Sequence, residues 1–259
     1  MIQQEIIEFL YTVPLMLRVT LIGSIPAIFT IIGSLPVLLN VKFTEKITDA
    51  GMGFAAGIML VASFTSLLLP AMNHGNIAIA ITGFIIGIIL VKVLDVLIPH
   101  IHFIKEYHNV GYSYSRKAWL MALAMIIHNI PEGMAVGAST TYDVTEGLII
   151  AIAIAIQDIP EGFATALPVL NIIKSKRQAF IISAISGIAE LLAALIPPLI
   201  IVFVHVALPL MLAIASGAMI YVVVHEIIPE IYGHEHNEPS TIGFFIGFIV
   251  MLLLDNILS

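Results

Sequence analysis

The sequence predicts an all-α polytopic membrane protein with eight transmembrane helices. Of its 259 residues, 60% are hydrophobic and only 10% are charged, and the mean hydropathy is +1.09. A soluble protein of this size would have about 25% charged residues. The apolar residues gather in segments near the ~20 residues that a helix needs to cross a bilayer. The connecting loops are short, so we expect a single transmembrane domain over 1–259.

Each predicted helix corresponds to one apolar segment. The N-terminal residues 1–12 carry acids but no Lys or Arg, which is not typical of a cleaved signal peptide. The chain has no Cys, so disulfides, iron–sulfur clusters and thiolate metal sites are excluded. We place the predicted helices at 13–39, 49–72, 77–99, 118–138, 146–170, 178–204, 207–231 and 241–258.

The distribution of basic residues predicts the orientation in the lipid bilayer. Lys or Arg occurs in the first, third and fifth loops, which lie on one side, and in none of the alternate loops. Basic loops tend to stay in the cytoplasm. We therefore expect a multi-pass protein of the cell inner (plasma) membrane with both termini outside. The loop residues concerned are Lys42, Lys46, Lys105, Arg116, Lys117, Lys174, Lys176 and Arg177.

Part of the sequence repeats at an offset of 160 residues. The segment 83–87 and the following Asp95 match the segment 243–247 and the following Asp255. Predicted helices 1–3 would then repeat as helices 6–8. Because helix 1 starts outside and helix 6 starts inside, the repeats would be inverted, as in many secondary transporters. The parts are repeat one at about 13–99, a central helix pair at about 118–170 and repeat two at about 178–258.

A motif rich in metal ligands occurs once in each helix of the central pair. It reads HNIPEG at 128–133 and QDIPEG at 157–162. Positions i and i+4 share a helix face, so His128 and Glu132 point the same way, as do Gln157 and Glu161. Asn129 and Asp158 follow one residue later, rotated by about 100°. Imidazole with carboxylate and amide oxygens suits Zn²⁺, Fe²⁺, Mn²⁺ or Co²⁺.

Each copy of the motif also contains a proline and a glycine. Pro131 and Pro160 have no N–H, so we expect a carbonyl one turn earlier in each helix to be free to face a cation or water. Gly133 and Gly162 would let the backbone bend and neighbouring helices approach. Both features favour a local distortion of the helix beside the candidate ligands.

Glu190 in predicted helix 6 is a further acid well inside a membrane span. With Glu132, Asp158 and Glu161 it would cost on the order of 10 kcal/mol if all four were ionised and unpaired, at ~2.5–3.5 kcal/mol each. The central helices contain no Lys or Arg to pair with them. We therefore expect metal ions or protons to neutralise these acids. An interhelical hydrogen-bond pair would explain one copy of the motif, but not two copies with another acid nearby.

The paired motifs resemble those of the ZIP (Zrt/Irt-like) family of divalent metal transporters, and the Gln-Asp form of the second copy resembles its bacterial branch. The resemblance covers nearly the whole chain and implies a 3+2+3 arrangement of helices, a homodimer and a binuclear site. Many members have His at the position of Gln157. Because this chain lacks that imidazole, we expect the first metal position to bind more weakly. One metal would use His128, Glu132, Gln157 and Glu161, and the other Asn129, Asp158, Glu161 and Glu190, with Glu161 bridging.

We therefore predict a transporter, not an enzyme, that carries Zn²⁺ into the cytoplasm as its substrate, with Fe²⁺, Mn²⁺, Co²⁺ and Cd²⁺ as further candidates and no cofactor. The import direction is implied by the resemblance. The sequence has no phosphate-binding GxxxxGK[ST] loop, so we expect neither nucleotide nor nucleic acid as a partner. The alternative is an intramembrane metal-dependent hydrolase with the same ligands, but a repeated motif favours a permeation path.

A second group of histidines and acids lies near the predicted inner ends of the helices. These residues would form an exit-side metal relay, or they are ordinary polar residues at a wet helix end; the sequence leaves both interpretations open. The group consists of Asp95, His100, His102, His225 and Glu226.

Overall fold

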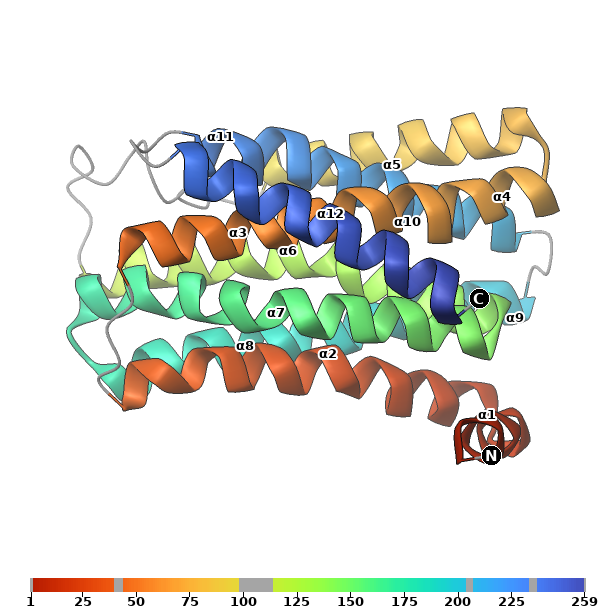
Figure 1. Ribbon diagram of the computed structural model, residues 1–259, viewed down its shortest axis with the longest axis horizontal. Helices are drawn as coiled ribbons and strands as arrows, with labels where there is room; N and C mark the ends of the chain where they lie inside the picture. The colour runs from red at the N-terminus through yellow and green to blue at the C-terminus, as the bar shows by residue number, and fades with distance from the viewer. Residues whose placement is uncertain (1, 40–43, 98–113, 204–206, 233–236, 259) are drawn as a thin grey trace.

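The computed structural model describes residues 2–39, 44–97, 114–203, 207–232 and 237–258, which form helices joined by short connections and contain no strand. Most of the helices run along the long axis of the molecule, and the two chain ends lie at the same end of the bundle (Figure 1). The predicted all-α class is therefore confirmed. His100 and His102 of the predicted exit-side group lie outside the described residues.

The first three predicted spans appear in the structure with small changes at their ends. A short helix that the sequence patterns did not predict precedes them, and it lies across the end of the bundle (Figure 1). The second span contains a π-helical turn at Ser63–Leu68 between two α-helical parts. The helices are α1 (Ile2–Thr12), α2 (Leu15–Leu38), α3 (Glu45–Ala62), α4 (Leu69–His74) and α5 (Ile77–Leu97).

The central pair and the last three spans follow in the predicted order. Predicted helix 6 divides at Leu195 into two helices, and predicted helix 7 contains a second π-helical turn at Val223–Ile227. The helices are α6 (Tyr114–Tyr142), α7 (Val144–Ile173), α8 (Lys176–Ala194), α9 (Ile196–Phe203), α10 (Leu208–Val222), α11 (Ile228–Ile231) and α12 (Asn237–Leu258).

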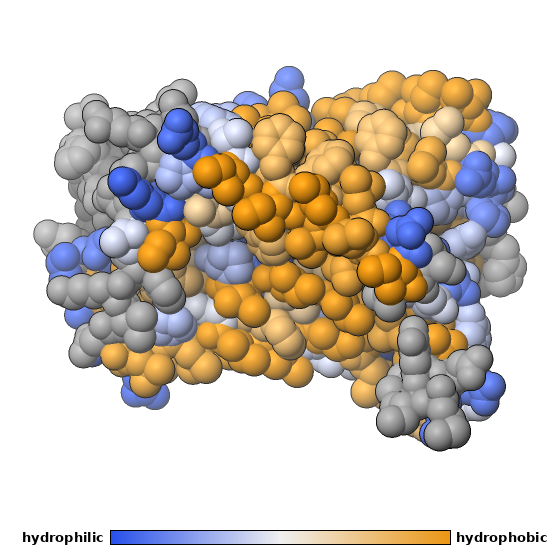
Figure 2. All heavy atoms as spheres, in the orientation of Figure 1, coloured by the Kyte–Doolittle hydropathy of each residue, from blue (hydrophilic) through white to orange (hydrophobic). Residues whose placement is uncertain are grey.

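The bundle has the polarity of a membrane protein. Among the described residues, seven helical stretches are long and apolar enough to cross a membrane. The 29-residue α6, which carries the first copy of the motif, has the length but is not among the seven. Apolar residues cover the middle of the surface in Figure 2, and hydrophilic residues gather toward its two ends.

Local sequence explains where the central helices begin and end. The carboxylate of Asp143 accepts hydrogen bonds from the N–H groups of Thr145 and Glu146 and so caps the start of α7. Lys174 takes a left-handed conformation, with φ of 57°, and ends the same helix. The helices continue through Pro131 and Pro160, as the predicted bounds of the central pair required.

Glycines allow the helices around the central pair to approach at backbone distance. Gly133 on α6 lies against the carbonyl oxygen of Glu190 on α8, and Gly162 on α7 lies against that of Thr30 on α2. A Cβ atom at either glycine would collide with the carbonyl. The four helices α2, α6, α7 and α8 therefore pack directly against one another, and this packing brings the acids of the two motifs next to Glu190.

Candidate metal centre

The seven residues predicted to bind metal all lie in the interior of the helix bundle. None of their side chains is more than 6% exposed, and both Glu132 and Glu190 are completely buried. α6 supplies three of them, α7 supplies three and α8 supplies one. They are His128, Asn129, Glu132, Gln157, Asp158, Glu161 and Glu190.

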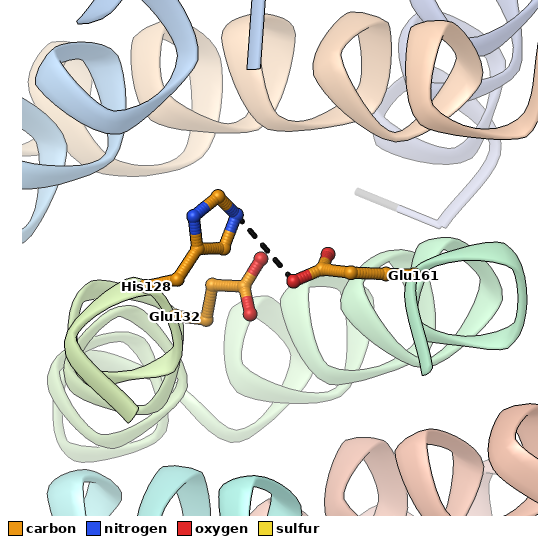
Figure 3. Close-up of side chains that lie close together, drawn as sticks. All are labelled: His128, Glu132 and Glu161. Carbon is orange, nitrogen blue, oxygen red and sulfur yellow. Dashed lines mark ion pairs between the residues drawn. The ribbon is translucent and has the colours of Figure 1, made fainter. Parts of the chain in front are cut away.

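A first group of side chains, His128, Glu132 and Glu161, forms between α6 and α7 (Figure 3). One ligand atom from each residue lies within 4.8 Å of the other two. The Nε2 atom of His128 is 3.4 Å from Oε1 of Glu161. Ligand atoms on a tetrahedral Zn²⁺ with bonds near 2.0–2.1 Å lie about 3.3 Å apart, so the separation suits a shared metal ion.

A second group, Glu132, Asp158 and Glu190, joins α6, α7 and α8 within the same limit of 4.8 Å. Glu132 therefore belongs to both groups. The family resemblance implies that Glu161 is the shared ligand; in the structure its Oε1 atom lies 3.4 Å from Nε2 of His128, in the first group. The Glu132 carboxylate also accepts a hydrogen bond from α7.

That hydrogen bond comes from Gln157, whose Nε2 atom donates to Oε1 of Glu132 at 2.5 Å. The amide nitrogen of Gln157 thus faces the carboxylate. Its Oε1 atom, like the Oδ1 atom of Asn129, is buried and has no hydrogen-bond partner among the described residues. Buried amide oxygens without partners are rare in proteins, and such oxygens are suitable ligands for a cation.

Several carboxylate oxygens of the centre are also buried without a hydrogen bond from the described part of the chain. They are Oε2 of Glu132, Oε2 of Glu161 and Oε1 of Glu190. A buried acceptor left unpaired costs about 1–3 kcal/mol, and more when it is charged. A divalent cation or protons would remove this cost, so the arrangement has the chemistry of a cation site.

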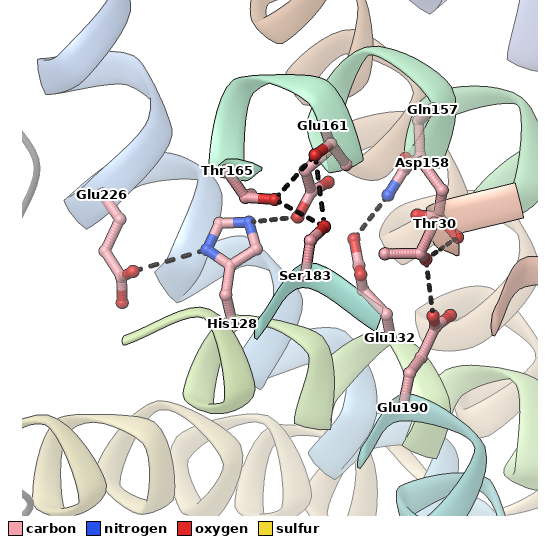
Figure 4. Close-up of polar contacts among 11 residues, drawn as sticks. Thr30, His128, Glu132, Gln157, Asp158, Glu161, Thr165, Ser183, Glu190 and Glu226 are labelled. Carbon is pink, nitrogen blue, oxygen red and sulfur yellow. Dashed lines mark hydrogen bonds and ion pairs between the residues drawn. The ribbon is translucent and has the colours of Figure 1, made fainter. Parts of the chain in front are cut away.

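Two further contacts around the centre were not expected at these places (Figure 4). The hydroxyl of Thr30 on α2 lies 3.1 Å from Asp158 and 3.3 Å from Glu190. Glu226, at the π-helical turn after α10, lies 3.4 Å from Nδ1 of His128. Thr30 gave no signal in the sequence, since a threonine in an apolar helix usually bonds only its own backbone.

Glu226 and His225 of the exit-side group each lie close to another ligand-type residue. Glu226 reaches the first group through His128, as above. His225 Nε2 lies 4.0 Å from Oδ2 of Asp95, with the His225 side chain 54% exposed and that of Asp95 14% exposed. Ligand-type residues therefore occur beside the buried centre, at Glu226, and at the more exposed His225 that precedes it in the sequence.

A helical bundle with membrane-spanning stretches and a buried cluster of His, Asp and Glu defines a multi-pass membrane protein with a candidate metal site. Residues 104–255 match the family model described as ZIP zinc transporter. The chain belongs to this family, which confirms the resemblance inferred from the doubled motif.

Curated relatives support the same assignment. The chain is 38% identical over 247 residues to the zinc transporter ZIPB of Bordetella bronchiseptica, covering 89% of this chain and 78% of the relative. It is 34% identical over 234 residues to the zinc transporter GufA of Myxococcus xanthus, with coverages of 86% and 92%. It is 32% identical over 243 residues to the zinc transporter ZupT of Escherichia coli, with coverages of 88% and 95%. The prediction of a transporter rather than an enzyme is thereby confirmed.

Proposed function

We propose that this protein transports divalent transition-metal cations, zinc foremost, into the cytoplasm through the buried centre between α6, α7 and α8. The observation that carries the proposal is the convergence of two groups of His, Asp and Glu that share Glu132 inside a membrane bundle. The zinc transporters named among its relatives support Zn²⁺ as the substrate. Fe²⁺, Mn²⁺, Co²⁺ and Cd²⁺ are further substrates that the same nitrogen and oxygen ligands suit.

The site is binuclear in this proposal. His128, Glu132, Gln157 and Glu161 bind one ion, and Gln157 contributes its buried, unpartnered amide oxygen. Asn129, Asp158 and Glu190 bind the other, with Glu132 as the shared carboxylate. Charge supports this stoichiometry: two divalent cations carry four positive charges, and Glu132, Asp158, Glu161 and Glu190 supply four negative charges when ionised.

We infer a 3+2+3 arrangement of inverted repeats around the central pair, and contacts at the offset of 160 residues support it. Gly243 on α12 lies against the carbonyl of Ala50 on α3. At the equivalent place, Gly83 on α5 lies against the carbonyl of Leu210 on α10. The π-helical turns also correspond, since one begins at Ser63 and the other at Val223.

The central pair follows the same relation. Gly133 of the first motif contacts the Glu190 carbonyl, and Gly162 of the second motif contacts that of Thr30, which lies 160 residues before Glu190. A pseudo-two-fold relation between the repeats thus also exchanges α6 and α7 at the metal site. In secondary transporters such sites lie near the bilayer midplane and open alternately to the two sides. Here α2, α6, α7 and α8 would carry the site, and the other helices would form a scaffold and the homodimer contact.

The orientation follows from the basic residues. Lys46, Lys174 and Lys176 lie at helix ends remote from the chain termini, and basic loops favour the cytoplasmic side. Both termini then face outward from the inner membrane. Glu226, with His225 and Asp95, leads from the centre toward the cytoplasmic end and would form an exit-side relay with His100 and His102.

An intramembrane hydrolase with the same ligands is the less favoured alternative. A catalytic zinc typically has three protein ligands and an open position for water. The centre described here has more candidate ligands than that, arranged in two groups. The relatives are also named transporters.

Uptake of radioactive zinc into proteoliposomes tests the proposal through the Glu161→Ala variant. We expect uptake to fall to the level of protein-free liposomes, because the first group loses its carboxylate from α7. Glu8→Ala, which removes an exposed acid on α1, serves as the matched control and should transport normally. Undiminished zinc flux in Glu161→Ala would exclude the site, and hydrolysis of a membrane substrate without metal flux would favour the alternative.

A further inference from the structure

The hydroxyl of Thr30 lies between two carboxylates of the second group, on a helix that supplies none of the proposed ligands (Figure 4). Its Oγ1 atom is 3.1 Å from Oδ2 of Asp158 on α7 and 3.3 Å from Oε2 of Glu190 on α8. The Thr30 side chain is only 3% exposed. One buried hydroxyl therefore connects acids from two different helices.

The position of this hydroxyl is fixed by close helix packing. Gly162 of α7 lies against the Thr30 carbonyl, and a Cβ atom at Gly187 of α8 would lie 3.2 Å from the Thr30 Cβ atom. α2 therefore packs closely against both α7 and α8 at Thr30. Threonine is also branched at Cβ, which restricts χ1 to few rotamers in a helix. Both constraints direct the hydroxyl toward the carboxylates.

The Thr30 hydroxyl has fewer hydrogens to donate than it has acceptors around it. It has one hydrogen to donate, and three acceptors surround it, since the carbonyl oxygen of Pro26 lies at 3.2 Å in addition to Asp158 and Glu190. It can align the two carboxylates but cannot satisfy both. Oε1 of Glu190 has no hydrogen-bond partner among the described residues. The pair is therefore held in place while it still has oxygens available for a cation.

We propose that Thr30 is a positioning residue that aligns Asp158 and Glu190 as oxygen ligands and so sets the affinity of the second metal position. This inference rests on the proposed binuclear site. Groups that orient metal ligands typically change affinity by about 10–100-fold when removed. Thr30 acts on one position only, because the described residues place no polar contact between it and His128 or Glu161.

The test compares Thr30→Val, which removes the hydroxyl at nearly constant volume, with Thr30→Ser, which keeps it. Thr20→Val is the matched control, because Thr20 lies on the same helix and its hydroxyl bonds only the Met16 carbonyl, at 2.8 Å. Zinc binding to the purified full chain is measured by calorimetry, and the KM and maximal rate of zinc uptake are measured in proteoliposomes. Thr30→Ala carries the same comparison if Thr30→Val does not elute as a folded species.

For Thr30→Val we expect one of two bound zinc ions to bind about 10–100-fold more weakly and the KM to rise. Thr30→Ser should restore both, and Thr20→Val should behave as the wild type. Wild-type affinity for both ions in Thr30→Val would overturn the inference, as would a Thr30→Ser variant as impaired as Thr30→Val. If the wild-type protein bound no zinc, the proposed function itself would be wrong, and the inference would fail with it.

Discussion

The side-chain amide of Gln157 on α7 donates a hydrogen bond to Glu132 on α6, and this contact joins the two copies of the doubled motif. The Glu132 carboxylate is a member of both groups of candidate ligands. The two copies therefore differ in their contacts as well as in sequence. His128 of the first copy faces Glu161 and Glu226, whereas Gln157, at the equivalent place in the second copy, supports the shared carboxylate.

Replacing Gln157 with His should change the ranking of transported metals. An imidazole adds a nitrogen ligand to the first position, which favours Zn²⁺ and Co²⁺ over the harder Mn²⁺. It also removes the amide that orients Glu132. Competition by a panel of divalent ions against radioactive zinc uptake measures the ranking, with Gln3→His on α1 as a control for the added histidine. Unchanged competition profiles would refute a role for this side chain in selectivity.

Glu132→Gln and Glu161→Gln should differ in how many zinc ions they lose. Glu132 belongs to both groups in the structure and Glu161 to the first. We therefore expect Glu132→Gln to weaken both bound ions and Glu161→Gln to weaken one, each by at least about 10-fold. Calorimetric stoichiometry on the purified protein distinguishes the two variants. If Glu161→Gln instead lost both ions, Glu161 would be the shared ligand, as the family resemblance implied.

Gly133→Ala should weaken both the fold and the second metal position. A Cβ atom at Gly133 would collide with the Glu190 carbonyl oxygen, so α8 must move away from α6. Overpacking of this kind costs about 1–3 kcal/mol. Gly23→Ala is the milder comparison, because the nearest atoms there are the side-chain carbons Ala194 Cβ at 3.2 Å and Leu191 Cδ1 at 3.3 Å. Gly133→Ala should have a lower unfolding temperature and weaker zinc binding than Gly23→Ala. Equal unfolding temperatures and zinc affinities in the two variants would contradict the close α6–α8 contact.

Asp143 should make stability depend on pH at the start of α7. Partial burial tends to raise the pKa of its carboxyl, but hydrogen bonds from the Tyr11 hydroxyl and from the Glu146 and Thr145 backbone N–H groups outweigh burial and lower the pKa below its usual value. A carboxyl with a lowered folded pKa stabilises the protein above its unfolded pKa. That contribution is lost as the pH falls through the folded pKa, below about pH 4.

Tyr11→Phe tests this pH dependence. Without the hydroxyl donor the pKa of Asp143 should rise toward its usual value, so the variant should be less stable near neutral pH and should lose less stability than the wild type as the pH falls. Asp143→Ala should cost about 1 kcal/mol through loss of the helix cap. The unfolding midpoint of the purified protein between pH 7 and pH 3 gives both effects, with Tyr232→Phe, directly after α11, as the control. A Tyr11→Phe profile that overlays the wild type would show that the hydroxyl contributes nothing.

Much of the candidate site could be predicted because its elements repeat within the sequence. The i and i+4 spacing fixed which motif residues share a helix face, and the scarcity of acids inside the spans singled out Glu190. The structure brings these residues together. That Glu132 lies in both groups of candidate ligands could not be predicted, because it depends on how side chains from three different helices are placed.

Other features depend on tertiary packing and have no recognisable pattern in the sequence. Thr30 resembles any threonine that bonds its own helix, and its contact with the acids follows from the rotation of α2 against α7 and α8. Glu226 was expected at an inner helix end, but it lies at a π-helical turn and reaches His128. A π-helical turn adds one residue to a helix, and the pattern of apolar residues in the sequence does not reveal it. Such turns are frequent at functional sites. The short helix α1 was also missed, because one segment of 11 residues carries too little periodic signal.

Anomalous X-ray scattering at the zinc absorption edge, from crystals grown with Zn²⁺, tests the central claim most directly. We expect two anomalous peaks inside the bundle, one among His128, Glu132 and Glu161 and the other among Glu132, Asp158 and Glu190. Peaks confined to exposed histidines, with none between α6 and α7, would contradict it.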